Sequence, residues 1–166
     1  VRRLAGEGLE DRAVFHRLAT DDIREACDVF APVHEATGDG YVSIEVDPDL
    51  AHDTEATVAQ ARELWKVVAR PNLMVKIPAT EAGIPAIEQV IADGINVNVT
   101  LLFDVGVYSR VREAWLRGLE RLHADGGDVA GVASVASFFV SRVDTKVDGL
   151  LDAMDGDDRR ELRGTA

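Results

Sequence analysis

One lysine, Lys76, stands inside the apolar stretch 73–80 (Leu-Met-Val-Lys-Ile-Pro-Ala-Thr). Pro71 and Asn72 precede this stretch and Pro78 follows its apolar part, which predicts a short β-strand. Apolar surroundings disfavour an ammonium ion and lower the pKa of a lysine. A neutral amine on a rigid strand can attack a sugar or keto carbonyl and form an imine. The alternative is a strand lysine whose ammonium reaches water or pairs with an acid.

Polar residues alternate with apolar ones along four predicted strands, 41–46, 73–80, 95–103 and 132–140. Because successive side chains point to opposite faces of a strand, each strand has one apolar face and one face with polar groups. The polar face of the first strand carries Ser43, Glu45 and Asp47, and that of the second carries Lys76. The third carries Asn96, Asn98 and Thr100, and the fourth carries Ser137 and Ser141 beside Phe139. An open sheet covered by helices on both sides needs two apolar faces. The pattern instead fits the inside of a (β/α) barrel, whose chemistry lies at the C-terminal mouth.

The segments between the strands have helical periodicity. A helical lead-in covers 1–38, with Thr20 as an expected N-cap inside it, and Gly38-Asp39-Gly40 ends it. Later helices are expected to begin at Asp53 or Thr54, near Pro85, after 103 and before 147. Strands that alternate with helices predict parallel βαβ units with right-handed crossovers. We therefore expect one α/β domain over 1–166, with the β/α units in 40–166.

The number of strands is half of what a closed barrel requires. A (β/α)8 barrel has eight strands and about 250 residues, whereas the pattern predicts four β/α units in 166 residues. The chain begins at Val1 without an initiator Met, which favours a partial barrel from a longer chain. The alternative is a homo-oligomer or a swapped assembly that covers the open edges.

Composition excludes several classes of protein. A net charge of −12 argues against non-specific binding to nucleic acid and to anionic membranes. No apolar run reaches membrane-spanning length, and the first residues lack a secretory hydrophobic region. Cys27 is the only cysteine, so neither a disulfide nor a cysteine metal cluster can form within the chain. The four histidines lack metal-type spacing. We expect a cytoplasmic protein with no cofactor and no metal.

The polar groups can be given roles if the strands are neighbours in chain order. Glu45 would face the same interior as Lys76 and could shuttle protons during imine formation and hydrolysis, or it could form a structural ion pair. Asn98 can hydrogen-bond sugar hydroxyls, and Thr100 can orient a water. Arg142, just past the fourth strand, suits a phosphate; the alternative is a solvated loop arginine.

Four of these stretches resemble transaldolase, of the longer bacterial type, in that family's order and spacing. They are Val42–Asp47 (VSIEVD), Lys76–Thr80 (KIPAT), Asn96–Phe103 (NVNVTLLF) and Ser137–Arg142 (SFFVSR). The resemblance implies a class I aldolase barrel of the pentose phosphate pathway. Such an enzyme moves a dihydroxyacetone unit from sedoheptulose 7-phosphate to glyceraldehyde 3-phosphate.

The resemblance also implies roles for single residues. Lys76 would be the Schiff-base lysine, and Glu45 with Thr100 would handle the catalytic water. The substrate would be bound by Asn98 and Ser137 at donor hydroxyls, by Phe139 lining the site and by Arg142 at the phosphate. The four strands look like strands three to six of the family's barrel.

Some parts of the family's site have no counterpart in this pattern. They are the general acid–base aspartate of the first strand, an asparagine of the second and phosphate contacts of the seventh. Two alternatives follow. One is another class I aldolase that acts on small phosphorylated aldehydes. The other is a non-catalytic fragment or subunit that binds sugar phosphate or assembles with other chains.

Overall fold

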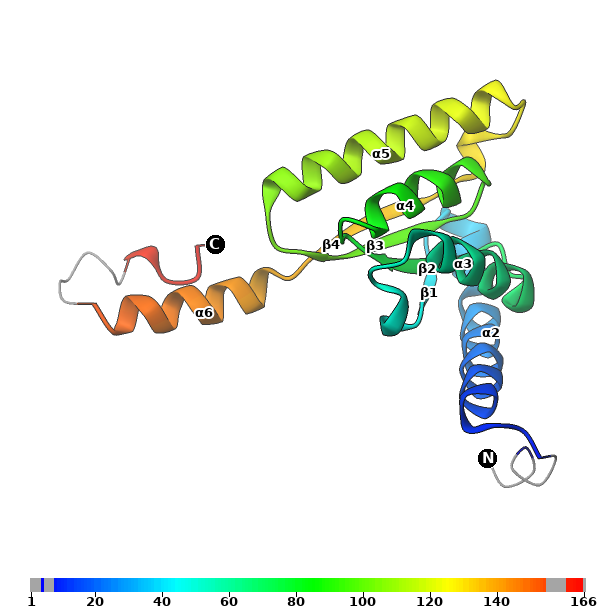
Figure 1. The fold of residues 1–166 in the computed structure, drawn as a ribbon, viewed down its shortest axis with the longest axis horizontal. Helices are drawn as coiled ribbons and strands as arrows, with labels where there is room; N and C mark the ends of the chain where they lie inside the picture. The colour runs from blue at the N-terminus through cyan, green and yellow to red at the C-terminus, as the bar shows by residue number, and fades with distance from the viewer. Residues whose placement is uncertain (1–3, 5–7, 155–160, 166) are drawn as a thin grey trace.

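The computed structural model describes residue 4 and the ranges 8–154 and 161–165. Four strands alternate with helices along the chain (Figure 1). The helices are α2 (Asp11–Thr37), α3 (Thr54–Val68), α4 (Gly83–Ala92), α5 (Val105–Ala124) and α6 (Val140–Asp152), with short 3-10 turns at Pro48–Leu50 and Val129–Gly131. The strands are β1 (Val42–Glu45), β2 (Leu73–Pro78), β3 (Val97–Leu102) and β4 (Ser134–Phe138).

The four strands form one parallel sheet in the order β1-β2-β3-β4. Each strand therefore lies beside the strand that follows it in the chain, as expected for successive βαβ units. The helices pack in the same order, α2 on α3, α3 on α4 and α4 on α5. This arrangement confirms the predicted α/β class and four β/α units. The extent of the domain over 1–166 stays a prediction.

The core lies between the sheet and these helices. Leu73, Val75 and Ile77 of β2 are fully buried, as are Ile87 and Ile91 of α4. On the other face of the sheet, Glu45 is exposed and Lys76 and Asn98 are partly exposed. The two-residue period had predicted this division, because alternate strand positions face opposite sides. The prediction of one apolar and one polar face is confirmed for β1, β2 and β3. It is wrong for Asp47, which lies beyond the end of β1, and for Ser141, which lies in α6, because both strands end earlier than predicted.

The lead-in differs from the prediction. Residues 11–37 form one continuous helix, so the expected N-cap at Thr20 is wrong. Thr20 is buried, and its hydroxyl donates to the carbonyl oxygens of His16 (2.8 Å) and Arg17 (3.2 Å) within the same helix. A threonine can be accommodated in a helix interior in this way. Asp53, in contrast, is an N-cap as predicted, because its carboxylate accepts from the Ala56 amide at 2.9 Å.

The fourth strand is shorter than 132–140. Its ladder ends at Phe138, and α6 begins at Val140. Phe139 therefore lies at the junction between strand and helix, and Arg142 lies in the first turn of α6 rather than in a loop. The sequence 132–140 is rich in Val and Phe, which favours a strand, but the backbone turns into a helix before this stretch ends.

Helix α6 extends away from the sheet (Figure 1). None of its described residues is buried, and its Leu150 is 58% exposed. Among the strands of the described ranges, β1 and β4 each have one neighbour, so neither outer edge of this sheet is paired by a described residue. Within the described ranges, no helix is long and apolar enough to cross a membrane.

Candidate active site

Lys76 and Glu45 lie side by side on neighbouring strands. They are register partners in the β1–β2 ladder, and Lys76 Nζ lies 3.4 Å from Glu45 Oε2. The side chains are 29% and 48% exposed, respectively. The sequence pattern had predicted this pairing on one face of the sheet. The surroundings are less apolar than expected, because a carboxylate and solvent both reach the amine. The distance fits either a proton shuttle or an ion pair.

Asn98 is the next group along the same face. It is the register partner of Lys76 in the β2–β3 ladder. Its amide nitrogen donates to Ser43 Oγ at 3.1 Å, and its amide oxygen accepts from Ser137 Oγ at 2.8 Å. The side-chain amide is thus held between two serine hydroxyls. The two bonds also connect β1, β3 and β4 across the face that carries Lys76.

Ser43 was given no role from the sequence. Its position on the polar face, two residues before Glu45, was the available signal. Its hydroxyl accepts a hydrogen bond from a strand that is not its neighbour, so the bond spans the width of β2. Strand order alone does not show such a contact. The structure thus adds Ser43 to the group around Lys76.

Asn96 shares this face but holds backbone groups. Its amide nitrogen donates to the carbonyl oxygens of Pro71 and Leu73 (both 2.9 Å), and its amide oxygen accepts from the Ala133 amide (2.8 Å). With 2% of its surface exposed, it is satisfied inside the structure. Asn96 therefore has a structural role here, because its amide group is fully occupied by backbone partners.

Thr100 lies two residues after Asn98 on β3. It is 1% exposed, and its hydroxyl oxygen has no hydrogen-bond partner among the described residues. Leu101, the next residue, has φ of +59°, and the β3–β4 register shifts between Val99 and Leu102. A β-bulge of this kind can re-aim a side chain. A buried hydroxyl that still has its hydrogen-bonding capacity suits the predicted role of holding a water.

Phe139 and Arg142 form a second group. The Arg142 guanidinium carbon lies 4.4 Å from the centre of the Phe139 ring, and Phe139 stacks on Phe103 with ring centroids 5.1 Å apart. Among the described residues, neither is hydrogen-bonded to Lys76, Glu45 or Asn98. The structure therefore brings Lys76, Glu45, Asn98 and Ser137 together. Thr100 lies on β3, the strand that carries Asn98. Phe139 and Arg142 lie at the start of α6.

Cys27, the single cysteine of the sequence, lies in the core. It is fully buried in α2, and burial raises the pKa of its thiol, which keeps the thiol protonated at neutral pH. In the described part of the chain, no three His, Cys, Asp or Glu side chains are grouped so that they could hold a metal ion.

Comparison with known proteins places the chain in a family. The sequence model described as "Transaldolase/Fructose-6-phosphate aldolase" matches residues 1–164. A protein named transaldolase from Saccharopolyspora erythraea is 57% identical over 166 residues. Proteins of the same name from Mycolicibacterium smegmatis and Mycobacterium ulcerans are 54% and 53% identical over 168 residues. Each match covers 100% of this chain and 45% of the relative, so the chain spans less than half the length of these curated relatives.

The fold of the family explains the open sheet. Transaldolases are eight-stranded (β/α) barrels, and four parallel β/α units with one polar face correspond to part of such a barrel. The match over almost the whole chain and the identities above 50% leave no other assignment. The chain belongs to the transaldolase/fructose-6-phosphate aldolase family.

Proposed function

We propose that this chain carries the Schiff-base part of a transaldolase site, with Lys76 as the nucleophile. The observation that carries this proposal is the 3.4 Å approach of Lys76 Nζ to Glu45 Oε2 on the polar face of the sheet. An amine beside a carboxylate, next to hydrogen-bonding amides and hydroxyls, has the partners that imine chemistry requires.

The proposed step begins with attack of the Lys76 amine on the ketose carbonyl carbon. The carbonyl oxygen leaves as water, and the lysine nitrogen forms a double bond to that carbon. Two protons move from nitrogen to the departing oxygen, and Glu45 would carry them. The Thr100 hydroxyl would hold that water. Hydrolysis runs the same steps in reverse and releases the amine.

The remaining groups are assigned to the substrate. Asn98 and Ser137 would bind the donor hydroxyls, and their mutual hydrogen bond at 2.8 Å holds them ready in a defined orientation. Phe139 would line the site. Arg142 would bind the phosphate through its planar fork. We propose sedoheptulose 7-phosphate as donor and glyceraldehyde 3-phosphate as acceptor, as in the pentose phosphate pathway.

Cleavage and transfer need more than these groups. The resemblance assigns the general acid–base step to an aspartate on a barrel strand that has no counterpart among β1–β4. We therefore propose that imine formation is the step that the four strands support, and that carbon–carbon cleavage draws on the remaining strands of the barrel.

Borohydride trapping tests this proposal. Reduction of the imine leaves a stable secondary amine, so the chain gains the mass of the ketose phosphate less one oxygen atom. The chain has only three lysines, Lys66, Lys76 and Lys146, so the modified peptide identifies the site without ambiguity. We expect sedoheptulose 7-phosphate to label Lys76. Lys76→Met should abolish labelling, whereas Lys66→Met and Lys146→Met should retain it.

Other outcomes of the same experiment point to the other functions. Labelling of Lys66 or Lys146, or no labelling at all, would remove Lys76 as the nucleophile and leave a subunit that binds sugar phosphate or has a structural role. The observation that favours this second candidate is the sheet of four strands, half of what a closed barrel requires. Labelling by simple phosphorylated aldol donors but not by sedoheptulose 7-phosphate would indicate a different class I aldolase.

Two further expectations stay predictions. Because β1 and β4 have open edges, copies of this chain are expected to associate, and light scattering after size exclusion measures that directly. A cytoplasmic location is proposed from the single, buried cysteine, which suits a reducing compartment.

A further inference from the structure

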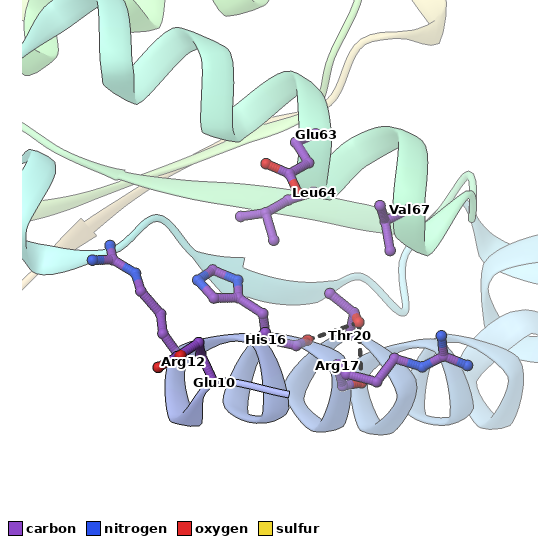
Figure 2. A pocket seen from close by; sticks show the side chains of 9 residues that line it. Glu10, Arg12, His16, Arg17, Thr20, Glu63, Leu64 and Val67 are labelled. Carbon is purple, nitrogen blue, oxygen red and sulfur yellow. Dashed lines mark hydrogen bonds between the residues drawn. The ribbon is translucent and has the colours of Figure 1, made fainter. Parts of the chain in front are cut away.

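Asp47 lies just after β1 and hydrogen-bonds side chains of both α2 and α3. It follows Glu45 by two residues, and only 13% of its side chain is exposed. Its carboxylate oxygen Oδ2 accepts from Arg12 Nε at 3.1 Å and from Arg12 Nη2, and lies 3.1 Å from His16 Nε2. Figure 2 shows Arg12 and His16 extending from α2 on the side that faces α3 and β1.

The backbone of Asp47 is held as well. Its amide donates to Gln60 Oε1 of α3 at 2.6 Å, and its carbonyl oxygen accepts from the Leu50 amide at 3.0 Å. Burial alone would raise the pKa of Asp47, but hydrogen bonds to Gln60, Arg12 and His16 keep it below the usual value. The carboxylate is thus charged at neutral pH and bonded to two side chains of the lead helix.

This attachment matters because Glu45 is the last residue of β1. The β1–β2 ladder holds Glu45, and the Val46 amide after it donates to the Lys76 carbonyl oxygen at 3.1 Å. The end of a strand opens more easily than its middle. The next fixed point along the chain is Asp47.

We propose that Asp47, clamped by Arg12 and His16, is a positioning residue that holds the end of β1 so that the Glu45 carboxylate stays beside the Lys76 amine. The clamp consists of Asp47, Arg12, His16 and Gln60. It couples the lead helix, which lies outside the sheet, to the reacting pair inside. This inference rests on the proposed function for its chemical meaning, although the geometry that it predicts can be measured without turnover.

Because the sequence has three lysines, the surroundings of the Lys76 amine can be followed by NMR. Reductive methylation with ¹³C-formaldehyde gives separate methyl signals for Lys66, Lys76 and Lys146, which Lys→Arg variants assign. Glu45→Gln in the full chain defines how far the Lys76 signal moves when the carboxylate is removed. We expect Asp47→Asn, and the double variant Arg12→Gln/His16→Gln, to move the Lys76 signal in the same direction. The Lys66 and Lys146 signals should stay in place in these variants. Arg12→Lys keeps the positive charge, so its Lys76 signal should lie close to the wild-type position.

A matched control separates positioning from general loss of stability. Arg62→Ala removes a different ion pair, with Asp93 at 2.7 Å, which joins α3 to the end of α4. We expect it to lower the melting temperature without moving the Lys76 signal. The inference is overturned if Asp47→Asn leaves the Lys76 signal at its wild-type position, or if Arg62→Ala moves that signal equally.

The two proposals can fail separately. Absence of borohydride labelling in the wild-type chain refutes the Schiff-base proposal, but the methyl signal still tests the clamp. Where labelling occurs, Asp47→Asn should slow it without changing the concentration of sedoheptulose 7-phosphate that gives half-maximal rate, because the clamp does not touch the substrate.

Discussion

Replacing Glu45 with glutamine is the most informative change for the proposed chemistry. Glutamine keeps the size of the side chain and can still hydrogen-bond, but it cannot accept and return a proton at neutral pH. If Glu45 carries protons between the lysine nitrogen and the departing oxygen, Glu45→Gln should slow imine formation about 100-fold or more. Hydrolysis of the imine should slow by a similar factor, because it uses the same groups in reverse.

The structure also predicts how large the effect of Glu45→Gln would be if Glu45 formed only a structural ion pair with Lys76. The pair is separated by 3.4 Å, and the two side chains are 29% and 48% exposed. Exposed pairs of this kind contribute at most about 1 kcal/mol, which corresponds to about a fivefold change in rate. A purely structural ion pair and a proton carrier therefore differ by more than an order of magnitude in their effect, and the rate separates them.

The assay is a time course of trapping. The chain is mixed with sedoheptulose 7-phosphate, samples are reduced with borohydride at intervals, and the labelled Lys76 peptide is quantified by mass spectrometry. Glu55→Gln, the same chemical change at an exposed position in the first turn of α3, is the matched control and should leave the rate unchanged. A decrease of less than about fivefold in Glu45→Gln would show that Glu45 is not the proton carrier.

Four other changes test the fold and the group formed by Phe139 and Arg142. Gly118→Ala would put a Cβ 2.7 Å from a backbone carbonyl oxygen of α4 and should cost about 1–2 kcal/mol in urea unfolding, whereas Gly149→Ala in α6 meets nothing within 4 Å and should increase helicity measured by circular dichroism. A hydrogen bond from Arg70 keeps the pKa of Asp28 below its usual value. The ionised carboxylate therefore stabilises the folded state fully above about pH 4, and this stabilisation is lost as the pH falls through the lowered pKa. Asp28→Asn should lower the urea midpoint of unfolding at neutral pH and leave it unchanged near about pH 2. Arg142→Gln should raise the concentration of sedoheptulose 7-phosphate needed for half-maximal trapping and leave trapping of unphosphorylated dihydroxyacetone unaffected, and an equal effect on both donors would remove Arg142 from phosphate binding.

The residues of the inner strands were predictable because burial there follows a simple period. Val75 and Ile77 had to face the helices, and Lys76 between them had to face the other way. A parallel sheet in chain order then places Glu45 beside Lys76 and Asn98 on the other side. The helix start at Asp53 was equally readable, since its capping chemistry is local.

The errors occurred where local preference and tertiary structure disagree. Thr20 has the side chain of an N-cap, but its hydroxyl satisfies carbonyl groups within a continuous helix. The residues after Phe138 have strand propensity, yet they begin α6. The hydrogen bond from Asn98 to Ser43 connects strands that are not neighbours, and the bulge beside Thr100 depends on a left-handed φ at Leu101. Neither feature has a signature in residue type or spacing.

The same contrast separates the two groups of the site. Lys76, Glu45 and Asn98 lie on strands that hydrogen-bond one another, so their mutual geometry is fixed by the ladders and by the bonds through Ser43 and Ser137. Arg142 lies on a helix with no buried described residue, and its contact with Phe139, whose amide donates to Leu102 of β3, connects it to the sheet. In a barrel, helices lie against the outside of the strands, and that packing would set the distance from Arg142 to the lysine. Imine chemistry should therefore depend on β1–β4, whereas recognition of the phosphate should depend on whatever covers α6.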